Sequence, residues 1–344
     1  MLLQQLISTA SFSKEEDATA TILRDFLHQH GIQTNRYLNN IWATNLHFDE
    51  SKPNLLLNSH HDTVKPNKAY TLDPFSPVEK EGKLYGLGSN DAGGSLVALL
   101  AVFLHFYESK DLKYNLVFAA TAEEEISGKN GIEALLPHLP ALDCGIVGEP
   151  TLMNMAIAER GLLVLDVTAT GKAGHAARDE GENALYKALT DIDWFRRFEF
   201  DRISPLLGKV KMTVTVIETE NKAHNVVPSQ CKFVADVRVN ELYSFEEILA
   251  IISENVTGEV VPRSLRMRST SIGMEHPLVK AGLELRRTYY GSPTTSDKAL
   301  MPFQTLKMGP GDSARSHTAD EFIYLDEIKK GIELYIDLLN KVIL

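Results

Sequence analysis

The chain has 344 residues, 44% hydrophobic and 24% charged, as in an ordinary globular protein. At roughly 150 residues per domain, this length predicts about two domains. Lysine and arginine total 35 against 46 aspartates and glutamates, and the net charge of −11 argues against a nucleic-acid partner, because phosphates repel an acidic surface.

The sequence has no segment typical of a membrane span. The longest unbroken apolar run covers 96–104, whereas a spanning helix needs about 20 residues. The N-terminal MLLQQLI lacks the basic start and long apolar core of a signal peptide, and is typical of the start of a helix. Cys144 and Cys231 lie in apolar, strand-like contexts and are expected to be buried, reduced thiols. These features predict a cytoplasmic protein without a membrane partner.

The first 160 residues alternate between helical and strand-like patterns. Apolar residues recur at helical spacing over 14–30, and Gly31 closes that stretch. Short apolar runs between polar turns predict strands at 54–58, 114–120 and 143–147. A helix is predicted at 94–108. Strands that alternate with helices favour an α/β domain with a mostly parallel sheet.

The middle of the chain, 161–270, has a different rhythm. Its predicted elements are a strand at 162–170, a helix at 183–198, strands at 211–218 and 231–239, a helix at 244–254 and a strand at 263–269. This β-α-β-β-α-β order is that of a ferredoxin-like α+β unit. A helix at 277–290, a strand at 304–308 and a helix at 325–342 follow. We therefore predict a discontinuous α/β domain at 1–160 and 271–344, with helices on both faces of its sheet, and an inserted domain at 161–270.

Acids and histidines follow the predicted strands of the α/β domain. They are His60, His61 and Asp62, then Glu123, Glu124 and Glu125, then Glu149, and finally Asp312 and His317. Asp91 lies in a glycine-rich turn. Ligands bind at the carboxyl ends of the strands in such sheets, so these side chains are expected to converge. Any one of them alone would be an ordinary solvated loop residue.

Imidazole and carboxylate groups together are the ligands that zinc prefers. Carboxylates crowded at one sheet edge would repel each other without a cation. Two ions roughly 3.5–4 Å apart with one bridging carboxylate would remove this repulsion and form a two-metal hydrolytic site. The pattern therefore predicts a metal-dependent hydrolase.

Five segments occur in an order that resembles a family. They are Ser59-His-His-Asp-Thr-Val, Tyr85-Gly-Leu-Gly-Ser-Asn-Asp-Ala-Gly-Gly, Thr121-Ala-Glu-Glu-Glu, Val147-Gly-Glu-Pro-Thr and Ser316-His-Thr-Ala-Asp-Glu. The family is that of the di-zinc amidohydrolases, which includes acetylornithine deacetylase, succinyl-diaminopimelate desuccinylase and the glutamate carboxypeptidases. The resemblance covers essentially the whole chain. It departs at Ser59, where glycine is usual, and at Leu87, where arginine is common.

The resemblance implies a site with two Zn²⁺ ions per subunit, for which Co²⁺ can substitute. Its metal ligands would be His60, Asp91 as the bridge, Glu125, Glu149 and His317. Asp62 would orient His60. Glu124 would be the general base that takes a proton from the attacking water, and a tight loop rather than a regular helix should present it. His61 occupies a variable position and is left out of the ligand set.

The resemblance also assigns roles to the inserted domain, as the dimerisation or lid domain of a homodimer. His175, in Gly171-Lys-Ala-Gly-His, would stabilise the oxyanion, often from the partner subunit. Asn225 and Arg238 would hold the substrate's α-carboxylate, and Thr295 and Ser296 would contact the substrate near the metals. For each of these residues a plain surface or loop position is the alternative.

The expected substrate is a small N-acyl amino acid, and the resemblance leans toward N-acetylornithine and hence arginine biosynthesis. Other candidates are N-acyl-citrulline, N-acetyl-lysine and N-succinyl-diaminopimelate. A metallo-exopeptidase has the same metal residues. A catalytically silent binding protein on the same scaffold would have lost Glu124 or a ligand, and none is lost. No Gly-x-Ser-x-Gly segment supports a serine hydrolase.

Overall fold

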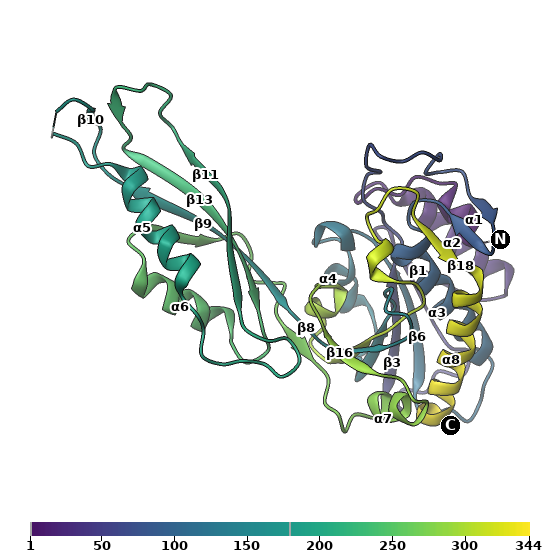
Figure 1. The fold of residues 1–344 in the computed structure, drawn as a ribbon. Helices are drawn as coiled ribbons and strands as arrows, with labels where there is room; N and C mark the ends of the chain where they lie inside the picture. Colours follow the sequence, from purple (N-terminus) through teal and green to yellow (C-terminus); the bar gives the residue numbers. More distant parts are fainter. Residues whose placement is uncertain (1, 179) are drawn as a thin grey trace. The chain divides into compact units, whose positions relative to one another are not determined.

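The structure, a computed structural model, describes residues 2–178 and 180–344. The chain divides into two compact units (Figure 1). Unit 1 comprises Met1–Ile157, Ser271–Tyr290 and Ser296–Leu344, and unit 2 comprises Ala158–Thr270 and Gly291–Thr295. The chain therefore leaves unit 1 near residue 158 and returns near residue 271.

A nine-stranded mixed sheet runs through unit 1 in the order β1-β2-β6-β3-β7-β17-β8-β15, with β16 also paired to β8. Its strands are β1 (Asn35–Tyr37), β2 (Asn40–Thr44), β3 (Asn54–His60), β6 (Asn115–Thr121), β7 (Cys144–Val147), β8 (Met155–Glu159), β15 (Thr270–Ser271), β16 (Tyr289–Ser292) and β17 (Gln304–Lys307). The central strands β6, β3, β7 and β17 are parallel to one another. Every residue of β3, β6 and β7 is buried, as expected for strands covered on both faces.

Helices pack on both faces of this sheet. They are α1 (Leu2–Ile7), α2 (Asp17–Gln29), α3 (Gly94–Phe106), α4 (Ile132–Leu135), α7 (Pro277–Glu284) and α8 (Leu325–Ile343). Phe103 of α3 packs on Phe118 of β6, with ring centroids 5.7 Å apart. The opposite face carries a cluster of Leu56, Val117 and Ile132 of α4. A small sheet of β4 (Val78–Lys80), β5 (Lys83–Tyr85) and β18 (Phe322–Tyr324) completes the unit. The predicted α/β fold with a mostly parallel sheet is confirmed.

The segment Ser89–Phe106, which contains α3, is long and apolar enough to cross a membrane by composition alone. However, 78% of it is buried inside the fold, as a central core helix must be. The two cysteines are also in the core. Cys144 in β7 and Cys231 in unit 2 are free and buried, as predicted. Burial raises the pKa of Cys144 to about 12, which keeps the thiol protonated and unreactive.

Unit 2 contains a four-stranded antiparallel sheet in the order β11-β13-β9-β14. Its elements are β9 (Gly161–Thr170), α5 (Ala184–Arg197), β11 (Lys211–Thr219), β13 (Gln230–Val239), α6 (Phe245–Asn255) and β14 (Glu259–Pro262), with a separate pair β10 (Gly174–His175) and β12 (Val226–Val227). Alternate residues of β9 are buried, so one face of the sheet packs against α5 and α6. This is the predicted β-α-β-β-α-β order.

Two predicted elements are wrong in their extent. The last strand of unit 2 is Glu259–Pro262 rather than 263–269. The proline there is tolerated because β14 is an edge strand, and beyond it Arg268 turns back to bond the carbonyl of Arg266. The helix predicted at 277–290 ends at Glu284, because Arg286 has a φ of 57°, which no helix continues.

Candidate metal centre

The carboxyl ends of three adjacent parallel strands deliver the candidate site. His60 is the last residue of β3, Glu124 and Glu125 follow β6, and Glu149 follows β7. His317 comes from the long connection after β17. The order β6-β3-β7-β17 explains why residues far apart in sequence meet at one edge.

His60 lies at the centre of the cluster. Its Nδ1 donates a hydrogen bond to the carbonyl oxygen of Asp62 at 3.0 Å, so the lone pair of the neutral ring is on Nε2. Within residues 2–178 and 180–344, this buried Nε2 has no hydrogen-bond partner. Carboxylate oxygens surround it at 3.4 Å (Asp91), 3.9 Å (Glu124) and 3.9 Å (Glu149). A lone pair and carboxylates that face one another form a set of donors that can hold a cation between them.

Asp91 lies between two histidines. Its Oδ1 is 3.4 Å from Nε2 of His60, and its Oδ2 is 3.5 Å from Nε2 of His317. The same His317 nitrogen is 2.9 Å from Oε2 of Glu125. Asp91 therefore presents one oxygen to each half of the cluster, which is the arrangement that a bridging carboxylate needs.

Two overlapping groups could each hold a cation. His60, Asp91 and Glu125 form one, and His60, Glu124 and Glu149 form the other, with ligand atoms within 4.8 Å of one another. Imidazole and carboxylate donors fit zinc. Glu124 and Glu149 are equally far from His60, so distance alone does not distinguish the predicted base from the predicted ligand.

The electrostatics of the cluster also favour a cation. Burial opposes a charge on His60, but Glu124 and the neighbouring carboxylates outweigh burial and raise the pKa of His60 well above its usual value. Burial raises the pKa of Glu124 well above its usual value, and it also raises the pKa of Glu125. By itself, the cluster therefore balances its charge by retaining protons. Divalent ions would supply that positive charge instead and leave the carboxylates ionised.

Asp62 connects His60 to the turn that carries Glu124. Its Oδ1 is 3.4 Å from Nδ1 of His60 and accepts the backbone N–H of Glu124 at 3.0 Å. Its Oδ2 accepts the N–H of Glu125 at 3.2 Å and the hydroxyl of Ser13 at 2.7 Å. Asp62 thus orients two acidic residues as well as the histidine.

A tight turn rather than a regular helix presents Glu124, as the sequence predicts. Glu123 has a φ of 55°, and a single short turn, Glu124–Ile126, follows it. The N–H of Glu123 donates to Oε1 of Glu16, which is fully buried. Oε2 of Glu16 accepts a hydrogen bond from the side chain of Asn39. Glu16, at the start of α2, therefore holds the backbone of the acidic turn through a hydrogen bond.

His61 is a structural residue. Its Nδ1 bonds the hydroxyl of Thr19 and its Nε2 bonds the carbonyl of Asn39, both at 2.9 Å. Burial lowers the pKa of His61 to about 4, so the ring is neutral. Both ring nitrogens are occupied, which agrees with leaving His61 out of the ligand set.

Two of the predicted residues of unit 2 are exposed, and Arg238 and Thr295 are partly buried. His175, in β10, is exposed, and its Nδ1 accepts the N–H of Ala177. Asn225 is exposed in the loop before β12. The guanidinium of Arg238 is already bound by Asp236 through two hydrogen bonds of 2.8 and 3.1 Å. The Thr295 hydroxyl donates to the carbonyl of Arg160.

Two acids beside the cluster were not predicted from the sequence as site residues. Asp297, next to the fully buried Ser296, accepts hydrogen bonds from Thr121 and Asn58, and burial raises its pKa to about 6. Glu321 closes the motif that contains His317, and burial raises its pKa to about 7. The available signals were the place of Glu321 in the segment Ser316-His-Thr-Ala-Asp-Glu and the place of Asp297 directly after the predicted Ser296.

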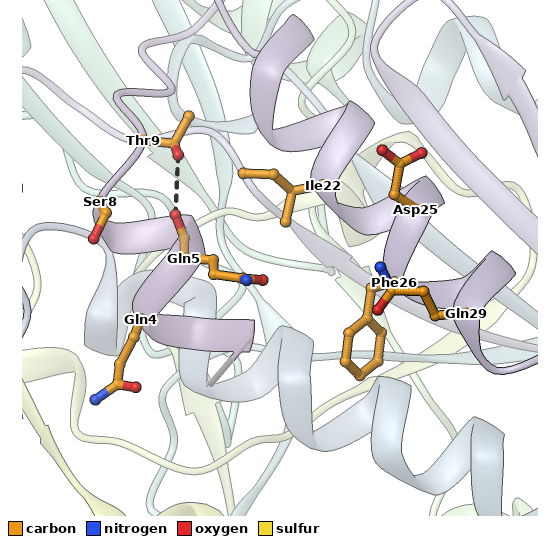
Figure 2. Close-up of a pocket in the computed structure, with 8 residues that line it drawn as sticks. All are labelled: Gln4, Gln5, Ser8, Thr9, Ile22, Asp25, Phe26 and Gln29. Atoms are coloured by element: carbon orange, nitrogen blue, oxygen red, sulfur yellow. Dashed lines mark hydrogen bonds between the residues drawn. The ribbon is translucent and has the colours of Figure 1, made fainter.

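A wide groove elsewhere in unit 1 does not contain the predicted site. It lies between α1 and α2 and encloses about 590 Å³ (Figure 2). Its lining residues are Gln4, Gln5, Ser8, Thr9, Ile22, Asp25, Phe26 and Gln29. Asp25 is the only ionisable residue among them, and it is paired with Arg24. The groove therefore has no acid–base or metal-binding cluster.

Comparisons with known proteins bear on the class of protein and on the fold. Residues 56–341 match the family described as peptidase family M20/M25/M40. A succinyl-diaminopimelate desuccinylase from Rickettsia bellii (strain OSU 85-389) is 25% identical over 98% of this chain and 95% of its own length. The aminopeptidase PepT of Bacillus cereus has the same fold, with a TM-score of 0.79 at 18% identity over 99% of this chain and 96% of its own. A dinuclear metal-binding M20 peptidase of Bacillus subtilis gives a TM-score of 0.72 at 14% identity over 98% and 95% of the two chains.

Proposed function

Because the chain belongs to peptidase family M20/M25/M40, and is therefore a metal-dependent hydrolase of amide or peptide bonds, we propose that it removes the acyl group from an N-acyl amino acid. N-acetylornithine is the first candidate substrate, which would give the enzyme a role in arginine biosynthesis. The desuccinylase relatives make N-succinyl-diaminopimelate the nearest rival. The observation that carries the metal-dependent hydrolysis in this proposal is Asp91, with one oxygen toward His60 and the other toward His317, and the choice of an N-acyl amino acid rests on the desuccinylase relatives.

The proposed cofactor is a pair of Zn²⁺ ions held by the five predicted ligands, His60, Asp91, Glu125, Glu149 and His317. When bound, the ions would polarise the scissile carbonyl and lower the pKa of water. Co²⁺ is an expected substitute, because it accepts the same imidazole and carboxylate donors.

Glu124 acts as the general base in this proposal. It takes a proton from the attacking water while the oxygen bonds to the carbonyl carbon. It then gives the proton to the nitrogen as the C–N bond breaks, so that the products are a carboxylic acid, which loses its remaining proton to water at neutral pH, and an amine. Asp62 holds the backbone of Glu124 for both steps. His175 would donate a hydrogen bond to the oxyanion.

Substrate recognition is proposed to involve Asn225, Arg238, Thr295 and Ser296. Arg238 could bind the α-carboxylate through a bidentate fork. Its donors are engaged by Asp236, so the substrate would have to displace Asp236 or bind beside it.

A homodimer in the cytoplasm is the proposed state. Within the described part of unit 2, β11 is an edge strand that pairs only with β13. It exposes Val216 and Ile217, at 48% and 46% of their surface. Such an edge is usually covered or paired, and a two-fold dimer is the commonest way to do so.

Removal of a ligand should remove zinc. Asp91→Ala, Glu125→Ala and His317→Ala are each expected to lower bound zinc together with activity, because each deletes a donor from the cluster. The effect should be largest for Asp91→Ala, whose carboxylate serves both halves. Elemental analysis of the purified proteins measures this directly. Unchanged zinc in all three variants would contradict the ligand set.

A substrate panel tests the reaction. N-acetylornithine, N-acetylcitrulline, N-acetyl-lysine, N-succinyl-diaminopimelate, dipeptides and tripeptides are assayed with added zinc or cobalt. An N-acyl amino acid should give the highest kcat/KM. Faster hydrolysis of peptides would instead identify an exopeptidase, as the names of PepT and similar structures suggest. Zinc binding without turnover of any compound would favour the silent binding protein.

A further inference from the structure

Glu321 is a buried carboxylate that binds the turn carrying Asp91. It lies just before β18, and 1% of its surface is exposed. Its Oε1 accepts the backbone N–H of Asn90 at 2.8 Å and of Asp91 at 2.9 Å. Its Oε2 accepts the N–H of Gly88 at 3.2 Å, and its own carbonyl accepts the N–H of Gly86. Four backbone N–H groups of the turn, those of Gly86, Gly88, Asn90 and Asp91, therefore bind this one residue.

The segment that carries Glu321 also carries His317. Asp320, between them, accepts two backbone N–H groups and a hydroxyl from Thr71 and Leu72. The segment is thus fixed on both sides. Glu321 therefore joins the segment that carries His317 to the turn that carries Asp91, and these two side chains face each other at 3.5 Å.

The donor pattern calls for a carboxylate at this position. Three N–H donors converge on its two oxygens, and an ionised carboxyl group accepts on both without offering a donor. A glutamine of the same shape would turn an NH₂ group toward at least one of these N–H groups. It would leave that donor buried and unpaired, which destabilises the turn.

We propose that Glu321 is a positioning residue for the metal centre, which holds Asp91 at the distance from His317 and Glu125 where the three can share a cation. The inference rests on the proposed zinc function, but it does not depend on the substrate. It predicts an effect on zinc affinity, because outer residues that orient ligands typically change metal affinity about 10–100-fold.

The test is a zinc titration of the metal-stripped full chain in the presence of a competing chelator. Glu321→Gln is expected to bind zinc about 10–100-fold more weakly than the wild type. A folded Glu321→Gln with wild-type zinc affinity would overturn the inference. Absence of zinc binding by the wild type would overturn the proposed metal function, and the inference with it.

Asp191→Asn is the matched control. Asp191, in α5 of unit 2, is a buried carboxylate that accepts the backbone N–H groups of Thr257 and Gly258. Its loss should lower the unfolding temperature of the metal-free protein without changing zinc affinity, whereas Glu321→Gln should change both. Equal losses of affinity in the two variants would mean a general effect of stability and would overturn the inference. If Glu321→Gln does not fold, Glu321→Asp replaces it, because the shorter side chain cannot reach all three donors. An unchanged zinc affinity of Glu321→Asp would likewise overturn the inference.

Discussion

Glu124→Gln is expected to lower kcat by at least ~10²-fold, the usual contribution of a general base, with the zinc content unchanged. The amide has the shape of the carboxylate but cannot accept the proton of the attacking water. The backbone bond from Glu124 to Asp62 does not involve the substituted group, so the turn should keep its shape. Steady-state kinetics on a metal-replete sample, with elemental analysis of the same sample, measures both quantities.

This experiment also separates a base from a ligand. Glu124 and Glu149 each have an oxygen 3.9 Å from Nε2 of His60, so the geometry alone leaves their roles interchangeable. Loss of activity with full zinc identifies Glu124 as the base, whereas loss of zinc identifies it as a ligand. Glu15→Gln, at an exposed acid near the start of α2, is the matched control and should keep wild-type activity. Near-normal turnover of Glu124→Gln would refute the assignment.

The fold follows from the sequence where local pattern and tertiary packing agree. The apolar runs that became β3, β6 and β7 are short, continuous and bounded by polar turns, and all are buried on both faces. The elements that differed lacked a local signal. α7 ends at Glu284 and Arg286 then has a φ of 57°, but no glycine at position 286 marks this end in the sequence. Pro262 argues against a strand at 259–262, and this edge strand is recognised only from the pairing of β14 with β9.

For the candidate site, the sequence predicts which types of residue lie at the ends of the strands. Sequence order places His60, Glu125 and Glu149 at one edge, because parallel strands share a direction. The contacts that hold them are not predictable in this way. Ser13 reaches Asp62 and Glu321 reaches Asp91 across 49 and 230 residues. Such bonds depend on how loops pack, for which no period or spacing exists.

Arg238 shows the same limit for substrate recognition. An arginine on a strand near a recognised motif suggests a bidentate site for a carboxylate. Its neighbour Asp236 lies two residues earlier on the same face of β13, because side chains alternate along a strand. The two side chains therefore form an ion pair with each other. The sequence shows that both residues are present, but not which partner the guanidinium prefers.

His175→Ala is expected to lower kcat by about 10²–10³-fold, the usual cost of losing one oxyanion donor. The exposed ring of His175 belongs to unit 2, and its Nδ1 is occupied by the N–H of Ala177, so Nε2 is free to carry the donated proton. Zinc should be retained, because the metal cluster belongs to unit 1. Elemental analysis and sedimentation of the variant would show that zinc and the proposed dimer persist. A variant with wild-type kcat would contradict the role.

Mixing His175→Ala with Glu124→Gln tests whether the histidine acts across the dimer. If it does, each hybrid dimer contains one site in which both the base and the oxyanion donor are intact, so a hybrid recovers up to half of the wild-type activity. If His175 serves its own chain, every site in the hybrid carries one lesion and activity stays lost. The exposed strand β11 provides the edge through which two copies would join. Subunit exchange must be verified with differently tagged chains, since absence of recovery after exchange would rule out the action of His175 in the partner's site.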